Sequence, residues 1–341
     1  MPNHSKPKRL IIIGAGLSGL YAAYLLQDHF EIVILEANDR IGGRILGTPN
    51  GGDLGPTWVW SHHKATLALS HELGVTLFAQ YTKGDALYDD PKGVQRFSPA
   101  PYAPSARFAG GVSTLTDALY NKLHRVKFHF NTPVDTILDQ DDGIIVQSRI
   151  NRYKCDRVIS TLPPRLIAEN IRFSPPLSSQ IVSELNQTPT WMAQSAKALI
   201  SYESAFWRED GLSGFAISHH GILGEIHDAS QADHPVLFGF FHAHRSVENS
   251  KSAIIDQLTR LFGPYAAHPL CIDLKDWKID PCCSTPLDQI PLCDHPDYGL
   301  DISAFDGRFS CIGTETSYIE GGYLEGALQS ALKISKQLLS I

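Results

Sequence analysis

A glycine-rich turn near the N-terminus constrains the fold more than any other stretch of this chain. The apolar run at residues 9–13 is typical of a buried strand, and it leads directly into the sequence GAGLSG at residues 14–19. Residues 20–26 then have the apolar spacing of a helix, and a second apolar strand at 32–35 ends on Glu36. This order of strand, glycine turn, helix, strand and acidic residue is the unit that binds a dinucleotide.

Each residue type in the turn has a physical role. Gly14 makes the tight turn, Gly16 lets backbone amides approach the pyrophosphate, and Gly19 lets the helix pack closely on the strand. The start of the helix, at Leu17 and Ser18, faces the phosphate charge. Glu36, with Ala37 beside it, is expected to accept a hydrogen bond from a ribose hydroxyl.

A second motif follows the acidic residue directly and narrows the choice of dinucleotide. The sequence RIGGR places Arg40 and Arg44 around the pair Gly42 and Gly43. The glycines allow close backbone approach, and an arginine fork suits a phosphate or the electron-rich edge of a ring. A plain nicotinamide-dependent dehydrogenase has no need of this element.

Composition restricts the partners. The chain has 341 residues, of which 43% are hydrophobic and 19% charged, and is long enough for two domains. A net charge of −7 argues against nucleic acid or an anionic membrane surface. No run of 18 apolar residues occurs, and only residues 1–8 precede the first strand. We therefore expect no membrane span, no signal peptide and a cytoplasmic location.

The cysteine and histidine pattern predicts no metal site. Six cysteines in a chain without a secretion signal indicate reduced thiols rather than a disulfide framework. Cys282, Cys283, Cys293 and His295 contain no CxxC pair, so a zinc site is not favoured there. His242 and His244 would share a strand face, but the sequence indicates no third metal ligand near them.

The remaining elements divide into two groups. Helices are predicted at 64–74 and at 110–123, the latter with Ser113 or Thr114 as its N-cap, while the proline-rich stretch 89–106 is expected to be irregular. Strands joined by short turns, as in a meander, are predicted at 126–130, 133–138, 143–148 and 157–162. A largely antiparallel sheet is predicted from 197–202, 212–217, 222–227 and 236–242, followed by a helix at 250–262.

Together these patterns predict an α/β fold. A Rossmann-type cofactor domain is assembled from residues 1–75, 106–186 and 280–341. A smaller α+β substrate domain, from residues 76–105 and 187–279, is inserted into it.

In this order, the motifs resemble those of the flavin amine oxidase family, the monoamine and polyamine oxidases and their relatives. The RIGGR sequence resembles the R-x-G-G-R stretch that continues the family's FAD motif. The DLG at residues 53–55, with Thr57 and Trp58, is similar to its D-L-G-x-x-W turn beside the flavin, and FSPPL at 173–177 matches its F-x-P-x-L marker. The resemblance covers nearly the whole chain. It implies FAD as cofactor, with a small-molecule amine and O2 as substrates.

The resemblance also assigns cofactor contacts further along the chain. Val134 matches the residue that gives backbone contacts to the adenine, and Thr161 lies at the next strand end. Gly313, Thr314 and Glu315 match the family's A-G-T/E-E-T, whose acid bonds the ribityl or phosphate region. Gly322, Tyr323 and Leu324 open a terminal helix, whose positive end can face the flavin's pyrimidine edge.

Three residues are expected to carry the chemistry. Lys197 stands nine residues before Phe206-Trp207, the spacing that in the family marks the lysine holding a water against flavin N5. Tyr323 matches one wall of the aromatic cage that grips the amine. Glu320 occupies a place where an aromatic is common, and a carboxylate there could pair with a cationic amine.

The sequence departs from the family at three points. After the W-x-x-D-P motif at 277–281, Pro286 stands where monoamine oxidases attach the flavin through cysteine. Leu287 stands where the second cage aromatic is expected, so we predict non-covalent FAD and an incomplete cage. The stretch between Trp58 and Gly110 is too short for the large helical subdomain of typical relatives.

The predicted function is FAD-dependent oxidation of an amine to an imine, which hydrolyses to an aldehyde, with reduction of O2 to H2O2. One alternative is a desaturase or porphyrinogen-type oxidase, which uses the same FAD frame on C–C bonds. Another is a flavin-binding partner protein without amine turnover. None of the motifs selects one amine or one oligomeric state.

Overall fold

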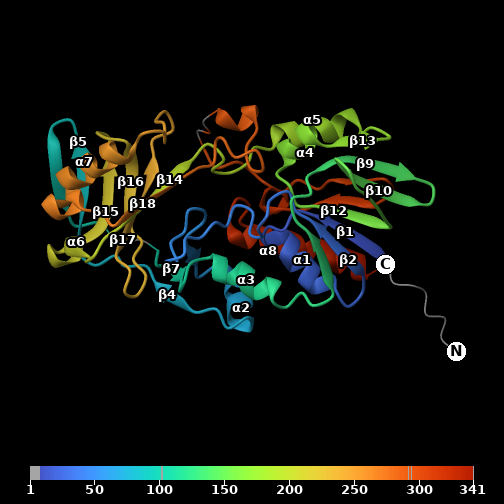
Figure 1. Ribbon diagram of the computed structural model, residues 1–341, viewed down its shortest axis with the longest axis horizontal. Coiled ribbons are helices and arrows are strands. Elements are labelled where there is room, and N and C mark those ends of the chain that lie inside the picture. The colour runs from blue at the N-terminus through green and yellow to red at the C-terminus, as the bar shows by residue number, and fades with distance from the viewer. Residues whose placement is uncertain (1–7, 101–102, 291, 293, 341) are drawn as a thin grey trace.

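Two large sheets lie at opposite ends of an elongated molecule (Figure 1). The computed structural model describes residues 8–100, 103–290, 292 and 294–340. One sheet is six-stranded and mostly parallel, in the order β19 (Ser303–Ala304), β20 (Phe309–Cys311), β12 (Arg157–Ser160), β1 (Arg9–Ile13), β2 (Glu31–Leu35) and β8 (Val126–His129). The parallel pairing of β1 with β2 and β12 confirms the Rossmann-type arrangement.

Strand β1 is buried on both faces because both sides of its sheet are covered. Leu10 and Ile12 point into one core, together with helices α1 (Leu17–Leu26) and α8 (Leu324–Leu339). Ile11 and Ile13 point into the other core. This explains why the strand reads as a continuous apolar run rather than as an alternating one.

The two covering layers differ in kind. Helices α1 and α8 pack against each other on one face, with α2 (Lys64–Glu72) and α3 (Ser113–Tyr120) beside them. The other face carries helices α4 (Pro164–Asn170) and α5 (Ser179–Gln187) and a four-stranded sheet. That sheet has the order β11 (Arg152–Cys155), β10 (Gly143–Ser148), β9 (Val134–Gln140) and β13 (Arg172–Ser174).

The second large sheet is seven-stranded and largely antiparallel, as predicted for the middle of the chain. Its order is β18 (Cys271–Asp276), β14 (Ala196–Ser201), β17 (Val236–Phe241), β16 (Leu223–Asp228), β15 (Leu212–Ser218), β5 (Asp85–Asp90) and β6 (Gly93–Phe97). Helices α6 (Phe206–Glu209) and α7 (Lys251–Phe262) contribute to its core, which includes the fully buried Trp207.

Short elements connect the two halves. A three-stranded sheet has the order β3 (Val59–Trp60), β7 (Ser105–Phe108) and β4 (Leu77–Ala79). The 3₁₀ turns η1 (Pro264–Ala267), η2 (Pro286–Gln289) and η3 (Thr314–Thr316) complete the elements.

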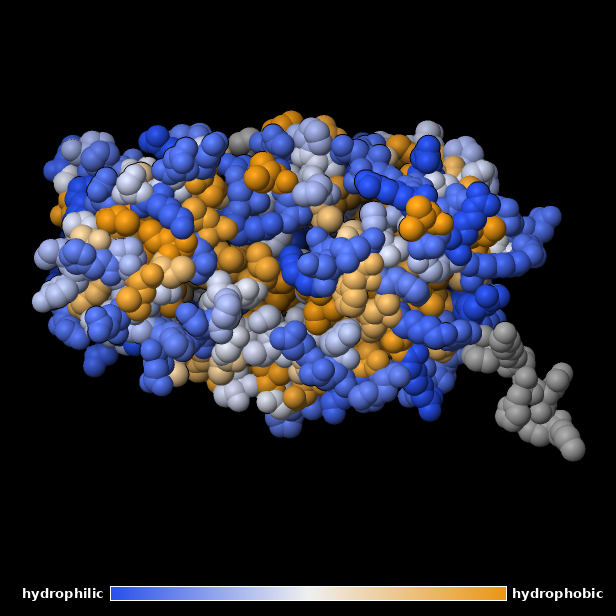
Figure 2. Space-filling model, in the orientation of Figure 1, coloured by the Kyte–Doolittle hydropathy of each residue, from blue (hydrophilic) through white to orange (hydrophobic). Residues whose placement is uncertain are grey.

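On the face in Figure 2, hydrophobic residues gather beside the seven-stranded sheet and towards the middle of the molecule, within a mostly hydrophilic rim.

The expectation that residues 89–106 are irregular was only partly right, since residues 98–100 and 103–104 are irregular but strands lie on either side of them. Strand β5 ends at Asp90 and forms a hairpin with β6 through the two-residue turn 91–92, and β7 begins at Ser105. Pro91 lies in the turn, and Pro99 and Pro104 lie between strands, so these prolines interrupt no ladder. The prolines therefore indicated the connections correctly, but the strands between them were not predicted.

The predicted meander at 126–162 was also only partly right. Strands β9, β10 and β11 form an antiparallel set, but β8 and β12 pair in parallel with β2 and β1 in the six-stranded sheet. The strand at Arg152–Cys155 was missed, because it alternates charged and neutral residues. Ser113 and Thr114 are not N-caps: α3 begins after Val112, and the Thr114 hydroxyl donates to the Gly111 carbonyl instead.

No helix among the described residues is long and apolar enough to cross a membrane.

Candidate active site

The glycine turn before α1 leaves open space at one position and is tightly packed at the other two. A Cβ on Gly14 would lie 2.4 Å from Thr161 Oγ1, and one on Gly19 would lie 2.2 Å from the Gly14 carbonyl oxygen. A Cβ on Gly16 would approach only the Gly42 carbonyl, at 4.0 Å. Gly14 and Gly19 are thus required for packing, whereas Gly16 keeps room above the helix start for a ligand.

Helix α1 begins without a side-chain cap from the described residues, and its first turn contains no acid. The N–H groups of a first turn lack partners within their own helix, so an anion is the natural ligand there. Leu17 and Ser18, the first residues of α1, are themselves buried. The geometry suits a pyrophosphate at this turn.

Glu36 is buried at the end of β2 and organises the turn. Its carboxylate accepts from the Ala15 amide at 2.7 Å and from the Asn38 amide at 2.8 Å. The oxygen bonded to the Asn38 backbone also accepts from the Asn38 side-chain amide at 3.0 Å, so the oxygen bonded to Ala15 is the one that can still accept from a ribose hydroxyl. Ala37 lies between Glu36 and Asn38 and is exposed.

The two arginines of the RIGGR motif play different roles. Arg40 donates to the backbone carbonyls of Ile41, Gly43 and Ile45, so it holds its own loop together. Arg44 forms a two-pronged ion pair with Glu315, at 2.6 and 3.0 Å. Gly42 and Gly43 both have positive φ, and Gly16 forms an isolated bridge with Gly42. The second motif therefore joins the glycine turn to the C-terminal segment.

Lys197 is buried, although an isolated lysine at a strand start is usually a solvated surface group. Its Nζ lies 2.5 Å from the Thr57 hydroxyl and 3.1 Å from the Gly55 carbonyl, and 4.1 Å from the centre of the Phe238 ring. Burial lowers the pKa of Lys197 to about 7, against an opposing effect of Asp53. The Lys197 amino group can therefore gain or lose a proton near neutral pH.

Asp53 and Arg107 form a second buried charged pair next to Lys197. Asp53 Oδ1 accepts from the Val112 amide at 2.7 Å, and Oδ2 lies 4.0 Å from Arg107. Burial raises the pKa of Asp53 to about 6, although Lys197 lowers it. Arg107 also donates to the Ser230 carbonyl, so it ties the DLG turn to the second sheet.

The segment 313–323 leads into the start of α8. The Thr314 hydroxyl donates to the Tyr323 carbonyl at 2.7 Å, and Gly313 and Gly322 have positive φ. Tyr323 is the extended residue before Leu324, and none of the described side chains caps the helix. Like α1, this helix start is left able to meet a ligand.

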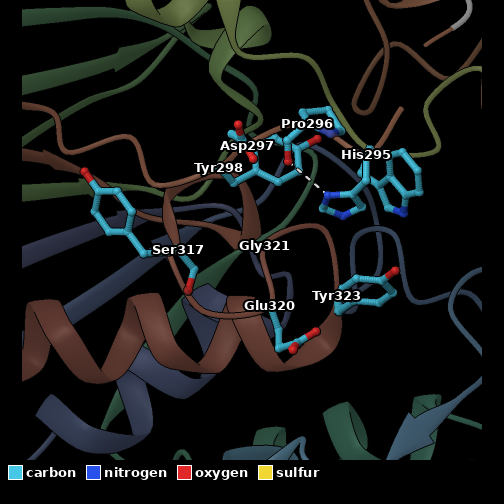
Figure 3. A pocket seen from close by; sticks show the side chains of 10 residues that line it. His295, Pro296, Asp297, Tyr298, Ser317, Glu320, Gly321 and Tyr323 are labelled. Carbon is cyan, nitrogen blue, oxygen red and sulfur yellow. Dashed lines mark hydrogen bonds between the residues drawn. The ribbon is translucent and has the colours of Figure 1, made fainter. Parts of the chain in front are cut away.

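An open pocket of about 580 Å³ lies between the start of α8 and the loop at 295–298. Figure 3 shows Glu320 and Tyr323 on the side of α8, with His295 on the facing loop. The rings of Tyr323 and His295 are parallel, with centroids 5.6 Å apart, and Trp191 packs 4.4 Å from His295. The pocket is lined by Trp191, His295, Pro296, Asp297, Tyr298, Ser317, Tyr318, Glu320, Gly321 and Tyr323.

Leu287, predicted to leave one cage wall missing, lies in η2 and is not among these lining residues. The ring that stands parallel to Tyr323 is instead that of His295, with Trp60 edge-on to Tyr323 at 5.9 Å. Burial raises the pKa of Tyr323, and Glu320 raises it further. The aromatic surface is therefore built from residues distant in sequence.

The remaining predicted residues lie apart from this pocket. Trp58 packs against His227 and Phe238, on the same side as Lys197. Val134 is buried at the start of β9, and the Thr161 hydroxyl donates to the Ile13 carbonyl at the end of β1. The candidate zinc ligand Cys293 lies outside the described residues. The five other cysteines are free.

Sequence reasoning missed the contributions of Trp191, His295, Arg107 and the pair His62 and His63. The first two lie in irregular loops, where no periodic pattern indicates which way a side chain points. Arg107 lies in β7, a strand that was not predicted. His62 and His63 lie 3.6 and 3.5 Å from the carboxylate of Glu320, and their position directly before the predicted helix at 64–74 was a signal visible in the sequence.

Comparison with known proteins agrees with this geometry. Residues 93–339 match the family of flavin containing amine oxidoreductases, and residues 12–88 match an NAD(P)-binding Rossmann-like domain. A probable flavin-containing monoamine oxidase A of Dictyostelium discoideum is 24% identical over 449 aligned positions, covering 96% of this chain and 97% of that protein. That span exceeds the 341 residues here, so the relative carries segments that this chain lacks.

Solved structures share the fold at low identity. Putrescine oxidase bound to putrescine superposes with a TM-score of 0.82 at 20% identity, covering 98% of this chain and 100% of its own. Cyclohexylamine oxidase from Brevibacterium oxydans gives 0.80, also at 20% identity and with the same coverage.

FAD fits the residues present. The space at Gly16, the uncapped start of α1 and the acceptor Glu36 suit its pyrophosphate and ribose, and the start of α8 lies where a ring edge can meet amide donors. Pro286, at the usual attachment position, has no group that could bond the flavin. The chain belongs to the family of flavin-containing amine oxidoreductases.

Proposed function

We propose that this protein oxidises an amine that enters the pocket lined by Tyr323 and His295, using FAD and O2. The observation that carries the proposal is the buried Lys197, held by Thr57 and Gly55 on one side of the site. FAD, when bound, supplies the redox chemistry by accepting the equivalent of a hydride from the carbon next to the amine nitrogen. The chain supplies binding, orientation and charge.

Lys197 is proposed to hold a water at the reacting edge of the cofactor. Its pKa near 7 means that the side chain can be neutral or charged under working conditions. In the charged form it stabilises negative charge that develops as O2 is reduced. The Thr57 hydroxyl and the Gly55 carbonyl fix the position of Nζ.

Tyr323 and Glu320 are proposed to select the substrate. Tyr323 and His295 offer aromatic faces to a cationic or apolar amine, and each such contact is worth about 0.5–2 kcal/mol. Glu320 is one-third exposed, so its carboxylate can meet a second ammonium of an extended substrate. The pocket is open, which favours bulky or extended amines over small ones such as benzylamine.

The test compares specificity constants for benzylamine and for extended diamines, in the wild type and in Glu320→Gln. We expect diamines to be preferred, and the preference to fall at least fivefold in the variant. Asp297→Asn, which alters another carboxylate of the same pocket, is the matched control. Efficient benzylamine turnover with no effect at Glu320 would reject this assignment of the substrate class.

The alternatives raised by the sequence are less well supported. The matching family consists of amine oxidoreductases, which does not favour a desaturase or a porphyrinogen-type oxidase. A flavin-binding partner protein without turnover would have no evident use for the titratable Lys197. Free cysteines suit a reducing compartment, and we propose a cytoplasmic location that cell fractionation can test.

A further inference from the structure

Three potential metal ligands converge beside Tyr323 from two segments far apart in sequence. His62 and His63 directly precede α2, and Glu320 lies just before α8. His62 Nε2 is 3.6 Å from one carboxylate oxygen of Glu320, and His63 Nε2 is 3.5 Å from the other. One ligand atom from each of the three residues lies within 4.8 Å of the other two.

These separations suit a shared metal ion better than direct hydrogen bonds. Hydrogen bonds from nitrogen to oxygen are shorter, about 2.7–3.2 Å. Zinc binds histidine nitrogen and carboxylate oxygen at about 2.0–2.2 Å in a tetrahedron, whose edges are therefore about 3.4 Å long. The two nitrogen-to-oxygen distances are close to that edge, each to a different oxygen of Glu320, so the carboxylate faces both histidines with one oxygen each.

His63 supplies a second, independent observation. Its side chain is only 1% exposed, yet neither ring nitrogen has a hydrogen-bond partner among the described residues. A buried polar atom without a partner is destabilising, so such atoms normally bind a ligand or a water. Trp60 and Tyr323 surround the ring with aromatic carbon, which leaves Nε2 facing Glu320.

The backbone at Glu320 is held in an unfavourable conformation. Its φ is +49°, in the left-handed region that side chains other than glycine, asparagine and aspartate seldom adopt. The Tyr323 amide donates to the Glu320 carbonyl at 3.2 Å and closes this turn. Strain of this kind persists where the position of the side chain matters, and here it places the carboxylate beside both histidines.

The surrounding charges permit a cation. The start of α2 carries partial positive charge, and Lys64 is its first residue. The buried carboxylate of Glu325, however, accepts from the Ala65 and Thr66 amides and offsets that charge. Lys64 Nζ donates to the Ser61 carbonyl, and His62 is 57% exposed, which gives an ion a path from solvent.

From this geometry we infer that His62, His63 and Glu320 form a site for a divalent transition metal, with Zn²⁺ as the probe ion. Three protein ligands leave a fourth position for water, as in sites where the metal stays accessible. Because Glu320 would be engaged, metal and a second ammonium would compete for it. That consequence rests on the proposed function, whereas metal binding itself does not.

The test is calorimetric titration of Zn²⁺ into the FAD-loaded protein without amine. We expect one site per chain, weakened at least tenfold in both His62→Ala and Glu320→Gln. The double variant His242→Asn/His244→Asn is the matched control, since its two rings also lie close together, with centroids 5.6 Å apart, outside the proposed site. It should bind Zn²⁺ as the wild type does.

Folding is followed separately through FAD content and the melting temperature of each variant. Should Glu320→Gln lose FAD, His62→Ala decides the matter, because the His62 side chain is 57% exposed. Absence of a Zn²⁺ site in the wild type, or affinity lowered only in the control pair, would overturn the inference. Amine turnover is measured in other samples, so its failure does not affect this result.

Discussion

Helices α1 and α2 differ in how the amides of their first turns are satisfied. At α2, the Glu325 carboxylate from α8 accepts from the Ala65 and Thr66 amides, each at 2.9 Å. At α1, no described side chain caps the turn, and Gly16 leaves the space above it open. The first-turn amides of α2 are hydrogen-bonded within the protein, which contributes to stability. Those of α1 are left free to bind a ligand.

The same distinction separates the ion pairs and polar groups around the site. Arg44 and Glu315 are paired with each other and join the two halves of the cofactor region. The start of α8 and the carboxylate of Glu320 lack such a partner at hydrogen-bonding distance among the described residues. Substitutions in the first class should alter folding, and those in the second should alter binding or turnover.

The largest effect of a substitution is expected at Gly16, on FAD binding. Gly16 has a φ of −73°, which any residue can adopt, and a Cβ there meets nothing closer than 4.0 Å. Gly16→Val should therefore fold but fail to bind FAD, because its side chain would occupy the space of the pyrophosphate. Flavin absorbance after purification and the melting curve of the apoprotein measure the two properties.

Gly19→Val is the matched comparison, since its side chain would clash with the Gly14 carbonyl at 2.2 Å. This variant should lose folded protein as well as flavin. If Gly16→Val retained FAD, or unfolded as Gly19→Val does, the proposed distinction between the two glycines would be wrong.

The cap at α2 should affect stability. Glu325→Ala removes the acceptor of two backbone amides and of the Thr66 hydroxyl, a loss of about 1–3 kcal/mol of unfolding free energy. Lys336→Ala, on an exposed position of the same helix, is the control. Urea denaturation of both FAD-loaded variants gives the comparison, and equal stability of the two would contradict the capping role.

The stability from Glu325 should also depend on pH. Burial alone would raise the pKa of Glu325, but hydrogen bonds from Gln329, Ala65 and Thr66 outweigh it and the pKa is lowered below 4.5. The contribution is thus complete above about pH 4.5 and is lost as pH falls through the folded pKa. The difference between wild type and Glu325→Ala should therefore narrow in acid.

The fold and the site could be predicted from the sequence where a role depends on local backbone geometry, but not where it depends on contacts between distant segments. The glycine turn, Glu36 and the RIGGR motif were identified because their roles depend on backbone geometry at fixed spacing, which a linear pattern records. The pairing of His295 with Tyr323 could not be predicted, since it depends on how an irregular loop returns to α8. Likewise, β8 and β12 read as ordinary strands, and only the fold reveals their parallel neighbours.

Lys197 combines features of the polar groups that are paired within the protein and of those left free for a ligand. It has partners in the protein, yet its charge can titrate near neutral pH. Lys197→Met should slow flavin reduction or reoxidation at least tenfold, about 1.4 kcal/mol of barrier, while FAD stays bound. In the wild type, reoxidation should slow as pH rises through about 7, where the ammonium loses its proton. Stopped-flow measurements should find this pH step absent in the variant; unchanged rates in both half-reactions would remove Lys197 from the site.

The smallest effect is expected at the aromatic wall. Tyr323→Leu removes one cation–π partner worth about 0.5–2 kcal/mol, so the specificity constant for an amine should fall by roughly 2- to 30-fold. Tyr323→Phe keeps the ring and should stay close to the wild type. A loss as large in Tyr323→Phe as in Tyr323→Leu would shift the role from the ring to the hydroxyl.

The most direct test of the whole account is anaerobic titration of the FAD-loaded protein with a panel of amines that includes diamines and bulky monoamines. We expect at least one amine to bleach the bound flavin stoichiometrically, and we expect air to restore the yellow colour with one H2O2 formed per flavin. Flavin that stays oxidised with every amine, while chemical reductants still bleach it, would contradict amine oxidation as the function.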